Sequence, residues 1–510
     1  MVVAVPALGS KWGMPDTADD GLLPVLVNTR ATLIRKPYVD SGPDTVPGQD
    51  LYTFEPYLAE SYEVSPDGLV YTFKLRDDVV SAAGNPLTAD DVVFSYQRKF
   101  GATGGQTPEV NAPALLSADQ VTKVDDSTVQ VRIDRPQDGL LLLAVMADYT
   151  GHIYDSTVLQ EHATPEDPYA LAWSDTDGNF AFGPYSIADY VSGQSVNLIK
   201  NKGFPSDLAA GPDTIIMRVI PDAGTRLNTL RSGDADMALN LEPQDLAAVS
   251  DDPSIVVPTA AKSNAWLIMS MMANKAPFDD PRVRQAMSYA IPYDRIIENV
   301  YFGRASRGTG GILDPDAPGY TSDGLTVYAS DPAKARQMLA EAGHPDGIAF
   351  ELTIDSSVPD LETAAVQMQT AAVEAGVEIT INKVSSSVFW QQRGEHTPQA
   401  FLTRDYAISL VPSYELRLYT HADSRNNLAD WTSPEFEARV EAAEAEPDPL
   451  SAEAGAKWNL AERFMVDQSS LNFVATVQPA LAYGSDVSGF VWRTDQFVDF
   501  SQITKGDAPE

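Results

Sequence analysis

Cysteine and histidine, which serve as nucleophiles, bases and metal ligands, are absent or scarce in this chain. It contains no cysteine, which excludes disulfides, thiolate metal sites and cysteine nucleophiles. Its five histidines are His152, His162, His344, His396 and His421. No two of them have the i, i+4 spacing that places two imidazoles on one helix face for zinc. We therefore expect no metal site and no cofactor.

Two short motifs superficially match ligand-binding loops. Segment 175–179 (DTDGN) has the residue types of a calcium loop, but its glycine comes too early and the closing glutamate is missing. Segment 308–311 (GTGG) is similar to part of a nucleotide loop, but it lacks the third glycine at the right offset. We expect an Asp-Gly turn in the first segment and a flexible loop in the second.

Aspartate and glutamate are abundant, with 72 side chains. Some pair of them will lie at the separation that glycosidases use, but a sequence does not measure that distance. The motifs HExxH, GxSxG and GxxxxGKS/T are absent. We therefore expect no enzyme active site built on one of these motifs. A carboxylate-dependent glycoside hydrolase acting on oligosaccharides is the alternative from the enzyme class.

The acidic side chains also set the net charge. With 35 Lys and Arg against 72 Asp and Glu, the formal charge is −37. A surface this acidic repels phosphate backbones, so we expect no nucleic-acid partner. Solubility is the simplest reason for the charge, and steering of cationic ligands is the alternative.

Length and hydropathy predict a globular chain outside the membrane. The 510 residues, 44% of them apolar, are enough for two or three lobes. No apolar run approaches the roughly 20 residues that a spanning helix needs. Residues 1–8 are apolar but too few for a signal peptide, and no basic residue precedes them. If the protein is exported, we expect this chain to begin after a removed leader, with a membrane link only through that leader or a lipid anchor.

Turn and cap residues predict where several elements begin. Segment 65–68 (SPDG) has turn chemistry, and apolar residues alternate after it, which predicts a hairpin. Thr88 with Asp91 fits a capping box that opens a helix. Asp280 and Asp331, each followed by proline, predict two further helix starts.

One segment predicts the fold class. A strand at 349–354, a helix at 361–372 and an alternating strand at 377–381 follow one another directly. This order is typical of a parallel crossover unit, and it therefore predicts an α/β lobe.

Four motifs occur in order over several hundred residues. They are the run 56–95, which contains PYLAESYEV, YTFKLR and PLTADDVVFS, then FGPY at 182–185, PFDDPRVRQA at 277–286, and the helix 331–343 with its following proline. Together they resemble family 5 of the extracellular solute-binding proteins, the oligopeptide-, dipeptide- and nickel-type receptors of bacterial ABC importers. The resemblance runs from about Tyr52 to about Trp431. It indicates a fold, and a fold does not set the ligand.

The resemblance implies an α/β fold of the periplasmic-binding-protein-like type II, with two α/β lobes around a hinge and a third, inserted lobe. Lobe I would comprise residues 1–36, 174–260 and 478–510, lobe II residues 37–173, and lobe III residues 261–477.

The resemblance also implies a function. The chain would be a monomeric, extracytoplasmic subunit, periplasmic or lipid-anchored at the outer face of the cell membrane. It would capture a small polar solute, in the first place a peptide, by closing two lobes, and deliver it to the permease. An oligosaccharide or an opine-like amino-acid conjugate is the alternative ligand, and a sensor is the alternative to the permease.

Two charged residues are implied as ligand contacts. In peptide-binding family members an aspartate just after a lobe III strand holds the ligand's ammonium group, and Asp405 matches this position. The alternative is a surface aspartate paired with Arg404. Dipeptide binders also carry an arginine before the helix at 361–372, where this chain has DSSVPD. That departure puts a strict dipeptide specificity in doubt, although Arg404 could supply the missing positive charge.

Aromatic and amide side chains complete the implied site. Trp12 follows the first expected strand, Trp266 precedes the 277–286 motif, and Trp390 precedes the strand that ends at Asp405. A tryptophan presents a flat face and an N–H donor, and Asn264 offers both a donor and an acceptor. The alternative for each of these residues is core packing.

Overall fold

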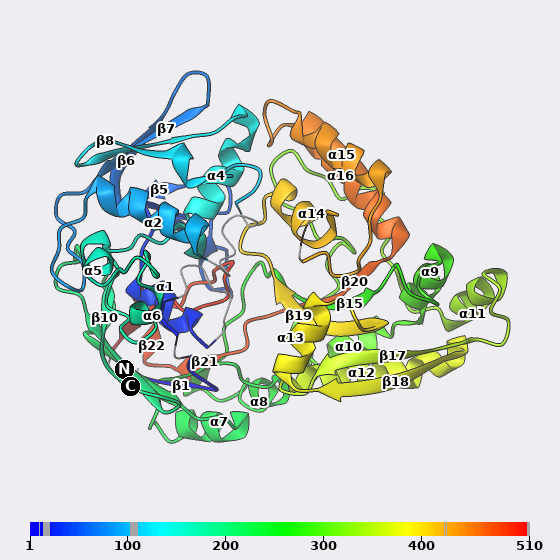
Figure 1. Cartoon of the computed structure of the whole chain (residues 1–510). Helices are drawn as coiled ribbons and strands as arrows, with labels where there is room; N and C mark the ends of the chain where they lie inside the picture. Colours follow the sequence, from blue (N-terminus) through cyan, green and yellow to red (C-terminus); the bar gives the residue numbers. More distant parts are fainter. Residues whose placement is uncertain (10, 14–20, 103–110, 423, 425, 507–510) are drawn as a thin grey trace. The chain divides into compact units, whose positions relative to one another are not determined.

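The computed structural model describes residues 1–9, 11–13, 21–102, 111–422, 424 and 426–506. The chain forms two compact units (Figure 1). The first comprises Met1–Leu241, Asp245–Lys262 and Pro479–Glu510, and the second comprises Glu242–Gln244 and Ser263–Gln478. The three-lobe division with its boundaries stays a prediction.

The first unit contains a seven-stranded mixed sheet in the order β10-β11-β12-β1-β13-β21-β14. Strand β1 pairs in parallel with β12 and β13, and β21, from near the C-terminus, pairs with β13 and β14. Segments far apart in the sequence therefore share one sheet. Its strands are β1 (Val2–Val5), β10 (Tyr185–Val191), β11 (Ser195–Lys200), β12 (Thr214–Val219), β13 (Met237–Ala238), β14 (Ile255–Val256) and β21 (Ala482–Gly484).

A second, antiparallel sheet of this unit has the order β6-β7-β9-β8. The predicted hairpin at 65–68 is confirmed, because it joins β6 to β7 and Gly68 adopts a positive φ of 72°. The capping box is also confirmed, since the backbone N–H of Thr88 donates to Asp91 Oδ2 at 2.8 Å at the start of α2. The strands are β6 (Ala59–Val64), β7 (Val70–Leu75), β8 (Val121–Asp125) and β9 (Thr128–Arg132).

Short strand pairs and helices make up the rest of the first unit. The pairs are β2 (Ile34–Arg35) with β5 (Glu55–Pro56), β3 (Tyr38–Val39) with β4 (Gly48–Gln49), and β22 (Val487–Ser488) with β23 (Thr504–Lys505). The helices are α1 (Leu23–Thr29), α2 (Ala89–Gly101), α4 (Gly139–Met146), α5 (Ser156–Glu161), α6 (Leu171–Ser174), α7 (Ala223–Arg231) and α8 (Pro243–Ala247), of which α8 begins in residues of the second unit.

The second unit is built on a six-stranded sheet in the order β16-β20-β15-β19-β17-β18. Strand β17 pairs in parallel with β18 and with β19, so the predicted crossover unit is confirmed. Every residue of β15 is buried, as expected for a central strand covered on both faces. The strands are β15 (Ala265–Met271), β16 (Ala305–Ser306), β17 (Ile348–Asp355), β18 (Val377–Val384), β19 (Ala400–Tyr406) and β20 (Leu471–Val477).

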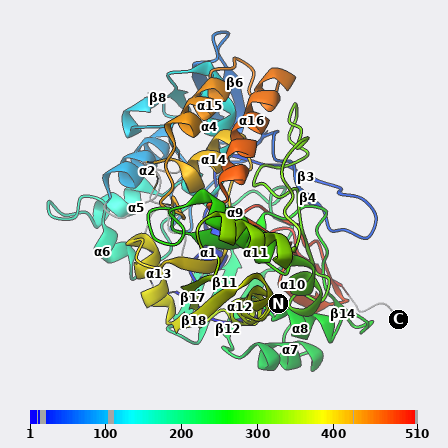
Figure 2. The same cartoon turned by 90° about the vertical axis from the view of Figure 1, so that its right-hand side faces the viewer.

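Helices pack around this sheet, α12 against β17, β18 and β19 (Figure 1), and α9 beside α11 (Figure 2). Asp280 and Asp331 cap α9 and α11 as predicted, since they accept from the backbone N–H groups of Arg282 and Lys334. The helices are α9 (Pro281–Ala290), α10 (Tyr293–Asn299), α11 (Pro332–Glu341), α12 (Pro359–Ala372), α13 (Ser386–Gly394), α14 (Pro412–Thr420), α15 (Pro434–Glu444) and α16 (Ala452–Gln468).

The described residues form neither a membrane-spanning helix nor a cluster of metal ligands. No helix among them has the length and hydropathy to cross a membrane. Nor does this part of the chain bring together three or more His, Asp or Glu side chains that could hold a metal ion.

Candidate functional site

The sheet of the second unit has a switch point between β17 and β19. From β17 the chain passes through α12 to β18 on one side, and then through α13 to β19 on the other side. In open α/β sheets, ligands bind outside the carboxyl ends of the strands at such a point. The carboxyl ends here are Asp355 on β17 and the segment Arg404 to Tyr406 on β19. Asp405 therefore lies at the carboxyl edge of the sheet, beside this switch point.

Asp405 lies at this edge of the sheet, and each of its carboxylate oxygens accepts a hydrogen bond. Its Oδ2 accepts from Arg393 Nη2 at 2.7 Å, and its Oδ1 accepts from the backbone N–H of Tyr406 at 2.9 Å. The pair is largely buried, with side-chain exposures of 8% for Arg393 and 18% for Asp405. Trp266 of β15 is the cross-strand partner of Asp405.

Arg393, the partner of Asp405, was not among the residues predicted from the sequence. It lies in the last turn of α13, and its guanidinium carbon stands 4.6 Å from the centre of the Trp390 ring. One helical turn separates the two residues, a spacing at which helix side chains meet. The i, i+3 spacing was the available signal, but nothing in the sequence places this helix face against the end of β19.

Arg404 points to the other face of the sheet, because neighbouring residues of a strand alternate between faces. Its Nη1 donates to Asp360 Oδ2 at 2.9 Å, and the Tyr301 hydroxyl donates to the same oxygen at 2.9 Å. Burial opposes the charge on Arg404, yet the attraction of Asp360 and Tyr301 raises its pKa. Burial, with the Asp360 charge beside it, raises the pKa of Tyr301 well above its usual value.

The tryptophans differ in their surroundings. Trp390 is 52% exposed, whereas Trp266 is 5% exposed and packs edge to face against Tyr419 and Phe473. Trp12 is 2% exposed and packs edge to face against Tyr190 in the first unit. Asn264 is fully buried and donates from Nδ2 to the carbonyl of Ala407, next to the end of β19. Trp390, Trp266, Asn264 and Asp405 are thus brought to one edge, and Trp12 belongs to the other unit.

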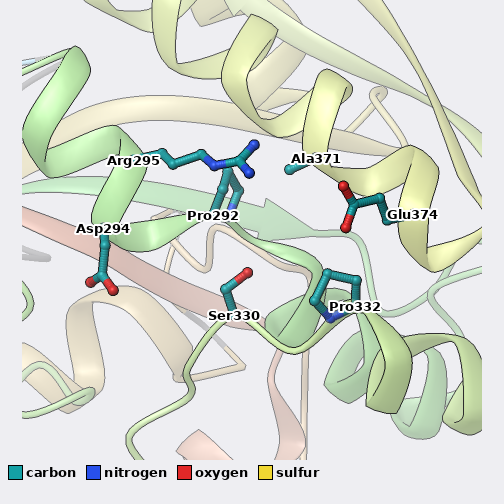
Figure 3. A pocket seen from close by; sticks show the side chains of 7 residues that line it. All are labelled: Pro292, Asp294, Arg295, Ser330, Pro332, Ala371 and Glu374. Atoms are coloured by element: carbon teal, nitrogen blue, oxygen red, sulfur yellow. The ribbon is translucent and has the colours of Figure 1, made fainter.

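A separate pocket of about 190 Å³ lies in the second unit (Figure 3). Arg295 and Glu374 project toward it from opposite sides, and Asp294, Ser330, Pro332, Pro292 and Ala371 complete its lining. None of the predicted ligand residues lines it. Its position at the ends of helices, away from the strand ends, assigns it no role in ligand capture.

The second unit also fully buries Glu462 and Glu415, which the sequence did not single out. Glu462 on α16 accepts from the backbone N–H groups of Ile312 and Leu313 at 2.7 and 2.8 Å, and from the Tyr320 hydroxyl. Burial raises the pKa of Glu462 to about 7. Burial and the charges of Asp314 and Glu462 raise the pKa of Glu415 well above its usual value. Glu462 can therefore exchange a proton near neutral pH, but burial separates both glutamates from a substrate.

Comparison with protein families gives a match over residues 53–427, to the description "Bacterial extracellular solute-binding proteins, family 5 Middle". Among relatives, "Heme-binding protein A" of Haemophilus influenzae is 33% identical over 316 residues, which covers 59% of this chain and 56% of that protein. The "Dipeptide-binding protein" of Escherichia coli is 33% identical over 318 residues, which covers 58% of this chain and 56% of that protein. These alignments thus span little more than half the length of either relative.

Solved structures share the fold at lower identity. The periplasmic binding protein DppA from Helicobacter pylori, in complex with the peptide STSA, has a TM-score of 0.82 at 22% identity, over 99% of this chain and 98% of that chain. The binding protein MoaA from Agrobacterium tumefaciens, in complex with mannopinic acid, has a TM-score of 0.79 at 23% identity, over 99% of both chains. The fold is therefore the periplasmic-binding-protein-like type II fold, as expected, and the chain belongs to family 5 of the bacterial extracellular solute-binding proteins.

Proposed function

We propose that this chain is the extracytoplasmic solute-binding subunit of an ABC importer, and that it captures a peptide and delivers it to the permease. The observation that carries the proposal is the family match over residues 53–427. The similarity to the dipeptide-binding protein of Escherichia coli and to the Helicobacter pylori protein in complex with a peptide supports the ligand class. The chain acts by binding alone and makes or breaks no bond in its solute.

The proposed ligand contacts are Asp405, Arg404, Trp390, Trp266 and Asn264 from the second unit and Trp12 from the first. The switch point between β17 and β19 supports this choice, because Asp405 lies at the carboxyl edge where such sheets bind ligands. Capture proceeds by closure of lobes I and III. Taking the protein from mostly open to mostly closed requires about 5 kcal/mol of differential affinity between the two forms.

The test is ligand-induced stabilisation of the whole chain. A peptide at 100 times its dissociation constant adds about 2.7 kcal/mol to the free energy of unfolding, so the thermal midpoint rises. The panel comprises di- to pentapeptides, opines and oligosaccharides, each followed by differential scanning calorimetry. If no peptide raises the midpoint, the peptide assignment is wrong. Chromatography of an oligosaccharide after long incubation tests the glycoside hydrolase alternative, for which shortened products are the signature.

Mannopinic acid, an opine, is the second candidate ligand. The structural match to a binding protein in complex with mannopinic acid favours it. Stabilisation by opines and not by peptides would select this candidate and leave the importer role intact. Uptake reconstituted with a permease and an ATPase encoded beside this protein distinguishes transport from a sensory role. Light scattering measures whether the subunit is monomeric, as we propose.

A further inference from the structure

Residues 307–331 of the second unit connect β16 to α11 and contain neither helix nor strand; we call this segment the strap. Segments of this length without secondary structure are uncommon in compact domains and usually have a function. Asn459 of α16 donates from Nδ2 to the backbone carbonyls of Thr321 and Asp323, at 2.7 and 3.2 Å. The strap is therefore bound along α16 by hydrogen bonds from a side chain of that helix.

Glu462 makes the central contact between α16 and the strap. Its Oε1 accepts from the backbone N–H groups of Ile312 and Leu313, at 2.7 and 2.8 Å, and its Oε2 accepts from the Tyr320 hydroxyl. A Cβ on Gly311 would collide with the same Oε1, so the strap approaches this carboxyl as closely as a glycine allows. Three donors of the strap thus converge on one buried carboxyl group.

Glu415, in the first turn of α14, is a second carboxyl group beside the strap. It is fully buried, and among the described residues neither of its oxygens has a hydrogen-bond partner. The backbone N–H of Asp314 approaches it without forming a well-aligned hydrogen bond. A buried carboxylate without donors has lost its hydration and gained nothing in return, so burial favours the protonated form of Glu415.

No cation balances the two glutamates within the described part of the chain. Besides each other, the titratable groups beside them are Asp314 and Tyr320 of the strap and Tyr419 of α14. The basic side chains of the adjoining helices are paired elsewhere or exposed: Arg417 pairs with Glu444, Lys457 pairs with Glu446, and Arg463 is exposed beside Gly324. Neighbouring carboxyl groups without a cation lose their protons in two separate steps, because the first charge opposes the second.

We propose that the strap responds to pH: it stays bound along α16 while Glu415 and Glu462 hold at least one proton between them, and it detaches when both are ionised. Detachment gives the two carboxylates access to water, which the bound strap denies them. The inference goes beyond the proposed function and does not depend on which solute the chain captures.

The direction of the response follows from the protonation of the two groups. Burial raises the pKa of Glu462 to about 7, and burial together with the charges of Asp314 and Glu462 raises the pKa of Glu415 well above its usual value. A raised pKa in the bound state means that protons stabilise this state, so its stability is lost as the pH rises above neutral. If detachment releases one proton, its equilibrium constant rises about tenfold for each pH unit.

Hydrogen exchange of the full, ligand-free chain tests the inference. Mass spectrometry measures the protection of backbone amides at pH 6 and pH 8.5, after correction for the intrinsic pH dependence of exchange. Protection of the strap amides should fall at least about tenfold between the two values. Amides of the buried strand β15, an internal reference, should change by less than about threefold.

Substitutions assign the response to the two glutamates. Glu415→Gln removes one ionisable group, and Glu462 alone can ionise in place because three donors surround it. The strap should then change its protection by less than about threefold. Glu415→Met, of similar size but without polar atoms, should do the same and guards against a folding defect caused by a buried amide. Glu441→Gln, at an exposed position of α15, is the matched control and should keep the full response.

Each outcome decides the inference. Loss of the response in the Glu415 variants, with the response kept in Glu441→Gln, supports it. Equal strap protection at both pH values in the unsubstituted chain overturns it, and so does a response that persists in both Glu415 variants. An equal fall in β15 shows unfolding of the whole unit and also overturns it. If one Glu415 variant does not fold, the other decides, and if neither folds, the comparison of the strap with β15 decides.

Discussion

At the scale of single residues, Glu462 connects stability to pH. Its pKa of about 7 lies above that of an exposed glutamate, so the folded state holds the proton more tightly than the unfolded state. The stabilising contribution is therefore full below about pH 4.5 and is lost as the pH rises toward 7 and above. Glu462→Gln should flatten the difference in unfolding free energy between pH 5 and pH 8, by at most about 3 kcal/mol.

Urea denaturation at the two pH values measures this effect, with Glu435→Gln, on the exposed face of α15, as the matched control. An unchanged pH dependence in Glu462→Gln would show that Glu462 ionises normally.

Single residues also show how much of the candidate site could be predicted from the sequence. Asp405 could be singled out, because a family motif and its place near the end of an expected strand mark it, although the structure includes it in β19. Its ion pair could not, since Arg393 lies twelve positions earlier on a helix whose orientation depends on tertiary packing. Of the three predicted tryptophans, Trp390 alone is widely exposed. The residue type by itself does not tell an exposed tryptophan such as Trp390 from a buried one such as Trp266.

At the scale of elements, the start of β10 depends on one glycine. A Cβ at Gly183 would lie 2.5 Å from the backbone nitrogen of Arg30 and closer still to the carbonyl of Thr29, at the end of α1. Gly183→Ala must therefore displace backbone, and overpacking of this kind costs typically about 1 to 3 kcal/mol. We expect a lowered thermal midpoint. Gly224→Ala in α7 meets only a side-chain oxygen at 3.6 Å and should be neutral or slightly stabilising. Equal midpoints for both variants would refute this account.

Local elements were the part of the fold that sequence patterns predicted well. The caps at Thr88, Asp280 and Asp331 and the hairpin at 65–68 rest on short-range chemistry, and each is confirmed. The order of the strands was not accessible, because the sheets join segments such as β13 and β21 that lie far apart in sequence. Pairing over such distances depends on the packing of whole layers.

At the scale of the whole molecule, the net charge of −37 affects how fast a charged ligand associates, and not the contacts that it makes once bound. The Debye length is about 30 Å at 0.01 M salt and about 3 Å at 1 M, so the summed field reaches a ligand only at low salt. We expect the peptide Lys-Ala-Ala to associate faster than Glu-Ala-Ala at low salt, with the two rates converging at high salt. Stopped-flow tryptophan fluorescence measures both rates. Equal association rates at low salt would leave solubility as the only role of the charge.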